Sequence, residues 1–228
     1  AASTHSNWDG TSLVVDEKSG RRVLTNAVYP EGSDHWRRGA EVSRASVEYM
    51  SYDLPGYPFP YPHMTSFWSG TRGGGMETPM MANDGAPRTF DSFVELLFHE
   101  ISHTYFPFYM GTNERKYAWM DEGWASMLPT KVVDDYAPEF DYRKRRVKSY
   151  VEGAGNEADL PLVTLSYSYS TRATRLGFYD RPANAYYALK EYLGDELFKE
   201  CLLEYVNRWK GKHPLPHDFF LTFNEVSD

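Results

Sequence analysis

The strongest constraint on this chain is the segment His-Glu-Ile-Ser-His at residues 99–103, followed after eighteen intervening residues by Glu122. An α-helix advances about 100° per residue, so His99 and His103 lie on one face of a helix, one turn apart. Glu100 points about 60° to 100° away from both histidines. The segment therefore predicts a helix on which two imidazoles grip one ion while a carboxylate stands beside it.

This donor set is typical of a catalytic zinc site. His99, His103 and Glu122 supply three protein ligands for one zinc ion, and three ligands leave the fourth tetrahedral position open. Two neutral imidazoles and one carboxylate leave a net charge near +1, so the ion stays a strong Lewis acid. The competing interpretation of the pentapeptide alone is a surface helix with two histidines. Glu122, in its own segment Trp-Met-Asp-Glu-Gly-Trp, favours the metal site.

Composition narrows the class of protein. With 41% hydrophobic and 25% charged residues, the 228-residue chain has the material for a globular core. Its net charge of −8 argues against a nucleic-acid partner.

The basic run at residues 143–146 is interpreted as a solvated helix face, with a contact to a neighbouring domain as the alternative. Cys201, the single cysteine, is expected to be a core thiol.

The chain lacks the patterns of membrane insertion. It contains no run of eighteen apolar residues, so we expect no membrane span. Residues 1–5 do not have the charged and then apolar pattern of a signal peptide. The compartment is therefore left open.

Periodicity predicts a small sheet followed by helices, which is an α+β layout. Strands are expected within residues 12–30, around the Ser19-Gly20 turn, and near residues 64–68 and 76–82. A helix is expected at residues 34–50, and helices predominate after residue 92, where residues 92–95 read as a capping box. We interpret residues 1–228 as one catalytic domain, with residues 1–30 as a candidate remnant of a preceding β-domain.

Further segments give the chain a resemblance to the M1 family of zinc aminopeptidases. The Gly-Gly-Met-Glu-Thr segment at residues 74–78 is similar to that family's Gly-x-Met-Glu-Asn motif, whose glutamate captures the substrate's α-amino group. The resemblance implies this role for Glu77, with Gly74, Gly75 and Met76 beside the substrate. From the residues alone, Glu77 is either an exposed charge at a strand end or a partly buried anion that awaits a cation. Thr78 departs from the family's asparagine.

The Tyr-Asp-Arg-Pro segment at residues 179–182 resembles the family's Tyr-Glu-Lys-Gly segment, so the resemblance gives Tyr179 the role of oxyanion stabiliser. From spacing alone, Tyr179 would be interpreted as an aromatic residue of the core or its rim. Tyr167, Tyr169 and Tyr187 are alternative candidates for the oxyanion role. Pro182 is well tolerated in a first helical turn, so a helix is expected from there to Gly194.

The resemblance implies a thermolysin-like catalytic domain with one zinc ion that hydrolyses the N-terminal peptide bond of peptides. In this interpretation Glu100 acts as general base and Tyr179 donates to the oxyanion. The expected partners are peptides with a free N-terminus and flanking domains of a longer parent chain. Two alternatives remain open: a zinc endopeptidase of the same fold, and a non-catalytic zinc-stabilised binding domain.

Overall fold

A computed structural model describes residues 6–32, 34–70 and 73–228. It divides into two compact units. The first comprises Ala1–Thr104 and Lys131–Phe140, and the second comprises Tyr105–Thr130 and Asp141–Asp228. Residues 1–5, which bear on the signal-peptide expectation and begin the candidate β-domain remnant, lie outside the described residues.

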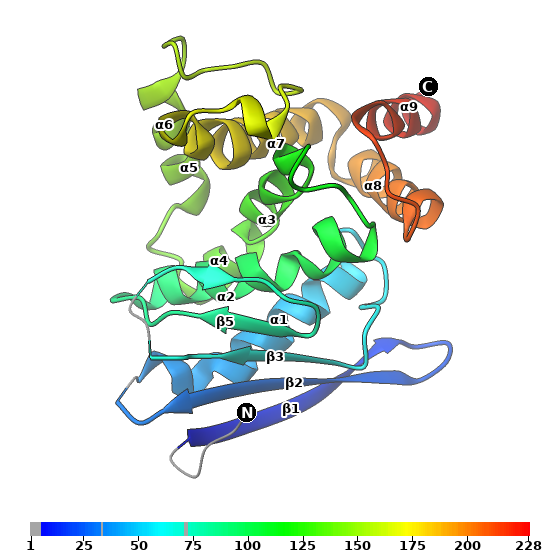
Figure 1. The fold of residues 1–228 in the computed structure, drawn as a ribbon. Coiled ribbons are helices and arrows are strands. Elements are labelled where there is room, and N and C mark those ends of the chain that lie inside the picture. Colours follow the sequence, from blue (N-terminus) through cyan, green and yellow to red (C-terminus); the bar gives the residue numbers. More distant parts are fainter. Residues whose placement is uncertain (1–5, 33, 71–72) are drawn as a thin grey trace. The chain divides into compact units, whose positions relative to one another are not determined.

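The first unit is built on a mixed sheet that, within the described residues, has five strands in the order β1-β2-β3-β5-β4 (Figure 1). β1 is antiparallel to β2, β2 and β3 are parallel, β3 and β5 are parallel, and β4 runs antiparallel to β5. With helices following the sheet, the predicted α+β class is confirmed. The strands are β1 (Ser6–Asp16), β2 (Arg21–Pro30), β3 (His63–Phe67), β4 (Gly75–Met76) and β5 (Met81–Asp84).

The strand expected at residues 76–82 is wrong as a single element. The chain turns between β4 and β5, and Met80 in the turn has a φ of 66°, which is incompatible with a continuous strand. β4 is therefore a separate edge strand, and it pairs through Gly75 with Asp84 and through Met76 with Asn83.

Two long helices pack on one face of the sheet. α1 contacts β1, β2 and β3, while α2 contacts β3, β4 and β5. The alternate residues of β2 that face the core, from Val23 to Tyr29, are buried. The helical elements of this unit are η1 (His35–Arg38), α1 (Gly39–Tyr52), α2 (Phe90–Ser102) and α4 (Thr130–Tyr136), the last joining the unit at Lys131.

The start of α2 corrects the capping-box prediction. The N-cap is Thr89, in an extended conformation, and the helix begins at Phe90. Ser92 lies within the first turn, where its hydroxyl donates to Asp91. The ring of Phe90 stacks on that of Phe93, with centroids 6.2 Å apart. This aromatic packing favours a helix that begins before Ser92, the first residue of the predicted capping box.

The second unit is helical and contains a core of aromatic rings. Trp124 stacks on Tyr186 with centroids 3.7 Å apart, and Phe219 packs edge-on against both rings. Cys201 is fully buried, which confirms the predicted core thiol. The elements are η3 (Ala118–Met120), α3 (Glu122–Met127), α5 (Tyr142–Gly153), η4 (Ser166–Ser168), α6 (Thr171–Thr174), η5 (Arg175–Asp180), α7 (Arg181–Leu193), α8 (Asp195–Trp209) and α9 (Pro216–Ser227).

Two irregular segments interrupt the regular helices: η2 (Thr104–Tyr109) is kinked at Phe106, which has non-helical backbone angles, and η5 is a wide, π-helical turn. η2 directly follows His103 and leads from the first unit to the second. η5 precedes α7, whose first turn contains Pro182 and whose C-cap is Gly194, as predicted.

The basic run on α5 is not uniformly solvated. Lys144 is exposed, but the side chain of Arg146 is only 6% exposed because it pairs with a buried carboxylate, Asp180. The solvated-face interpretation is therefore wrong for Arg146.

None of the helices in the described part of the chain combines the length and apolar character that crossing a lipid bilayer requires.

Candidate active site

The first unit presents the two histidines from one firmly packed helix. Phe93, Leu97 and Ile101 on α2 are fully buried. His99 is in the last turn of this helix, and His103 is its C-cap with helical backbone angles. Burial of the apolar face fixes the rotation of the helix, and this holds both imidazoles on the same side.

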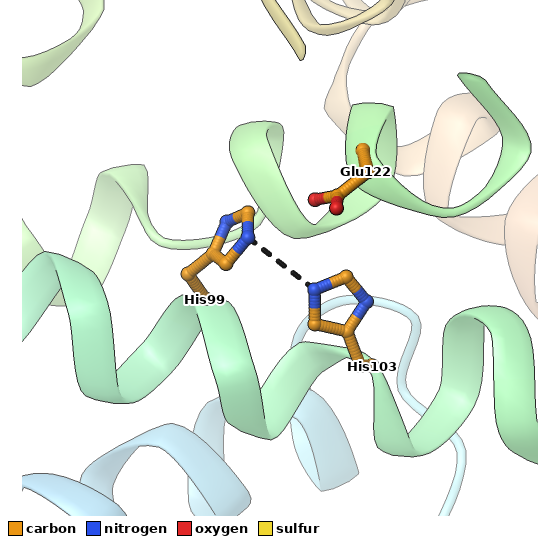
Figure 2. Close-up of side chains that lie close together, drawn as sticks. All are labelled: His99, His103 and Glu122. Atoms are coloured by element: carbon orange, nitrogen blue, oxygen red, sulfur yellow. Dashed lines mark hydrogen bonds between the residues drawn. The ribbon is translucent and has the colours of Figure 1, made fainter. Parts of the chain in front are cut away.

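The imidazole geometry fits one zinc ion. The Nε2 atoms of His99 and His103 lie 3.3 Å apart, and the dashed line in Figure 2 joins them. Two nitrogens at about 2.05 Å from a tetrahedral zinc are separated by about 3.3 Å. His103 is almost fully buried, so its ring is held in place by the surrounding residues. The two candidate ligand nitrogens thus lie at a distance that would suit one zinc ion.

Glu100 lies beside the histidines and is packed against the backbone of the edge strand β4. The residue is only 5% exposed. A Cβ added at Gly75 would lie 2.1 Å from Glu100 Oε1 and 2.3 Å from its Cδ. Gly75 therefore makes room for the carboxylate of Glu100, a reason for this glycine that sequence reasoning did not identify. Gly74, with a φ of 72°, has open space around its missing Cβ.

Glu77 comes close to the same cluster. Ligand atoms of Glu77, Glu100 and His103 all lie within 4.8 Å of one another. Glu77 is half-buried, whereas Met76 is 58% exposed. Two carboxylates gathered at this distance form a favourable position for a cation, in keeping with the partly buried anion considered from the sequence.

Asp84 is a buried acid that the sequence reasoning missed. It is fully buried on β5, opposite Gly75 in register. Burial raises the pKa of its carboxyl well above the ordinary value, and the negative charge of Glu100 raises it further. Burial and the charge of Glu100 therefore both favour the neutral form of the Asp84 carboxyl. Its only sequence signal was a carboxyl group at the end of an apolar strand.

The second unit presents Glu122 at the first position of α3, and Figure 2 shows its carboxylate at that end of the helix. The next residue explains how this end is packed: a Cβ added at Gly123 would lie 2.6 Å from the Cβ of Pro182. Glycine therefore allows α3 and α7 to approach closely, and the Trp124–Tyr186 stack extends this contact.

Tyr179 lies in η5 and reaches Glu122. Its hydroxyl donates to Glu122 Oε1 at 2.7 Å. Of the competing tyrosines, Tyr169 donates to the carbonyl of Pro161, and Tyr187 shares a hydrogen bond with Thr130. Tyr167 is 70% exposed. Tyr179 is thus distinguished from these neighbours by its contact with a candidate metal ligand.

Each unit therefore groups a part of the predicted site. The first gathers His99, His103, Glu100, Glu77 and Gly75, and the second joins Glu122 to Tyr179.

One protein family and two known aminopeptidases are similar in sequence to this chain. The model of the peptidase family M1 domain matches residues 75–228. Aminopeptidase N of Plutella xylostella is 23% identical over 159 residues, which are 67% of this chain and 17% of that protein. Aminopeptidase M1-C of Oryza sativa subsp. japonica is 21% identical over 134 residues, 57% of this chain and 15% of that protein. The chain thus spans less than a fifth of the length of these relatives.

Solved structures share the fold. A variant of the M1 zinc metallopeptidase from Deinococcus radiodurans superimposes with a TM-score of 0.73 at 14% identity, covering 97% of this chain and 49% of that one. The same metallopeptidase variant bound to a Tyr-Ser-Ala substrate gives a TM-score of 0.68 at 16% identity, covering 96% and 50%. The chain spans about half of that protein.

Proposed function

The chain belongs to peptidase family M1, and from that membership we propose that it is a zinc-dependent aminopeptidase that hydrolyses the N-terminal peptide bond of peptides. The observation that carries the proposal is the 3.3 Å separation of the His99 and His103 Nε2 atoms, with the buried Glu100 carboxylate beside them. This is the separation that two ligands of one tetrahedral zinc require.

We propose that His99, His103 and Glu122 hold the ion. Two imidazoles and one carboxylate are a donor set that suits zinc and leaves a position open. Bound zinc would supply Lewis acidity, which polarises the scissile carbonyl and makes water a stronger acid.

Glu100 is the proposed general base. It takes a proton from the attacking water and later delivers that proton to the leaving amine. The support is its burial and its packing against Gly75, because both hold the carboxylate in one position. A base held in this way needs little reorganisation during the reaction.

Glu77 is the proposed anchor for the α-ammonium group of the substrate. The half-buried carboxylate of Glu77 lies close to that of Glu100. Two neighbouring negative charges are stabilised most by a compact cation that also donates hydrogen bonds, such as an ammonium group. Within the described residues β4 (Gly75–Met76) is the last strand of the sheet, so an extended peptide can lie along its outer side, next to Gly74. Together these features favour a substrate that ends at its N-terminus near Glu77.

Tyr179 is the proposed donor to the oxyanion that forms when water adds to the carbonyl. The support is its 2.7 Å hydrogen bond to Glu122, because this contact brings the hydroxyl next to a proposed ligand. Rotation about the Cζ–O bond redirects its one proton without moving the ring. A positioned donor of this kind contributes on the order of 10² to 10³ in rate.

The test is turnover of an aminoacyl anilide with a free amine and of the same compound with an N-acetyl group. The proposal predicts zinc-dependent cleavage of the free compound, little cleavage of the acetylated one, and loss of turnover but not of zinc in Glu100→Gln. Comparable cleavage of blocked and free peptides would favour the zinc endopeptidase. Stoichiometric zinc with no turnover on either class would favour the zinc-stabilised binding domain.

A further inference from the structure

The second unit contains a buried ion pair between Arg146 and Asp180, the residue that follows Tyr179 in the chain. Nη1 of Arg146 on α5 is 3.2 Å from Oδ1 of Asp180, and the two side chains are only 6% and 2% exposed. Ser149 donates to the other carboxylate oxygen of Asp180 at 2.6 Å, and Arg175 Nε lies 3.5 Å from it. Desolvation of two charges offsets most of their attraction, so a geometric role explains such a pair better than stability does.

The pair connects the element of Tyr179 to the helix of Glu122. Arg146 Nε donates to the hydroxyl of Tyr142 at 2.9 Å, and that hydroxyl donates to the carbonyl of Ser126 on α3 at 2.8 Å. Ser126 is one helical turn after Glu122. At the other end, Asp180 is the chain neighbour of Tyr179. A continuous set of hydrogen bonds therefore runs from α3 through Arg146 to the residue next to Tyr179.

The backbone around Tyr179 has an irregular conformation that contacts with other elements can stabilise. Tyr179 and Asp180 end the π-helical turn η5, where the N–H of Arg181 donates to the carbonyl of Leu176, five residues back. Wide turns of this kind are rare and cluster at functional sites. The turn is also tightly packed at Gly177, since a Cβ added there would lie 2.0 Å from the ring of Tyr169. Contacts with Tyr169 and with Arg146 therefore both restrain η5.

We propose that Arg146 and Asp180 are positioning residues for Tyr179: they fix η5 relative to α3, so that the Tyr179 hydroxyl is held at Glu122. The kinetic consequence rests on the proposed aminopeptidase function, in which that hydroxyl serves the oxyanion. The structural consequence does not, because every contact in the set lies within the second unit.

The test places 3-fluorotyrosine at position 179 of the full chain and records its ¹⁹F NMR resonance. Asp180→Asn keeps hydrogen-bonding capacity but removes the charge that Arg146 pairs with. We expect its resonance to move outside the parent linewidth or to divide, while Asp180→Glu recovers most of the parent signal. The matched control is Asp159→Asn, which removes the ion pair of the adjacent residue Arg181 and should leave the resonance in place.

Kinetics of the unlabelled variants give the second measurement. Asp180→Asn should retain zinc and lower kcat by about 10-fold to 10²-fold with little change in KM, because the displaced hydroxyl acts in the transition state. Asp159→Asn should stay within threefold of the parent.

The outcomes separate the two proposals. An unmoved ¹⁹F resonance in Asp180→Asn overturns the positioning role, and so does an equal change in Asp159→Asn, which would show general loosening of the unit. If Asp180→Asn does not fold, Ser149→Ala, which loses only the 2.6 Å hydrogen bond, must shift the resonance in its place. A parent protein without peptidase activity refutes the aminopeptidase function, yet the resonance still decides the role of Arg146 and Asp180.

Discussion

Gly75→Ala is the substitution for which the structure gives the sharpest expectation. The new methyl group would lie 2.1 Å from Glu100 Oε1, and its three nearest atoms all belong to the Glu100 side chain. The carboxylate must retreat by about 1.3 Å to reach an ordinary contact distance. None of these three nearest atoms belongs to the imidazoles of His99 or His103, so we expect zinc content not to change.

The expected kinetic loss follows from that displacement. Misplacement of a catalytic group by about 1 Å costs on the order of 10² in rate, or about 2.7 kcal/mol in activation free energy. We therefore expect kcat for an unblocked aminoacyl anilide to fall about 10²-fold while zinc per chain, measured by elemental analysis, stays at the parent value.

Gly73→Ala is the matched control, because a Cβ at Gly73 has no other heavy atom within 4 Å. It should leave kcat within threefold of the parent. A zinc-loaded Gly75→Ala enzyme with parental kcat would refute the reasoning, since it would mean that the position of Glu100 does not govern the rate. A loss of zinc in Gly75→Ala would refute it as well.

Three further outcomes are expected. His103→Ala should lose zinc and activity together, and stoichiometric zinc in that variant would contradict the ligand assignment. Tyr179→Phe should lower kcat by roughly 10² to 10³ with little change in KM, whereas Tyr187→Phe should stay within threefold; the reverse pattern would move the oxyanion role to Tyr187. The pKa of Asp84 is raised in the folded state, so its contribution to stability is complete below the unfolded-state pKa and is lost as the pH rises through the folded-state pKa. In urea titrations of chelator-treated protein, the free energy of unfolding should therefore fall less between pH 5 and pH 8.5 for Asp84→Asn than for the parent. Equal losses in the two proteins would argue against a buried neutral carboxyl.

The sequence by itself determined the features that depend on local spacing. His99 and His103 are four residues apart, so the pitch of one helix places both side chains on the same face, and the packed rotamers then bring their Nε2 atoms to 3.3 Å. The helix from Pro182 to Gly194 likewise follows from a tolerated proline and a glycine at the C-cap. The order of a small sheet and later helices was readable from the change of hydrophobic period.

Only the tertiary structure decided how distant segments meet. Gly75 reads as a flexible residue in a glycine-rich run, but the Glu100 side chain, twenty-five positions later, occupies the space of its missing Cβ. Arg146 reads as one of four solvated cations, but it is buried because Asp180, thirty-four positions later, compensates its charge. Burial and charge pairing depend on neighbours in space, and no periodicity within α5 or β4 records them.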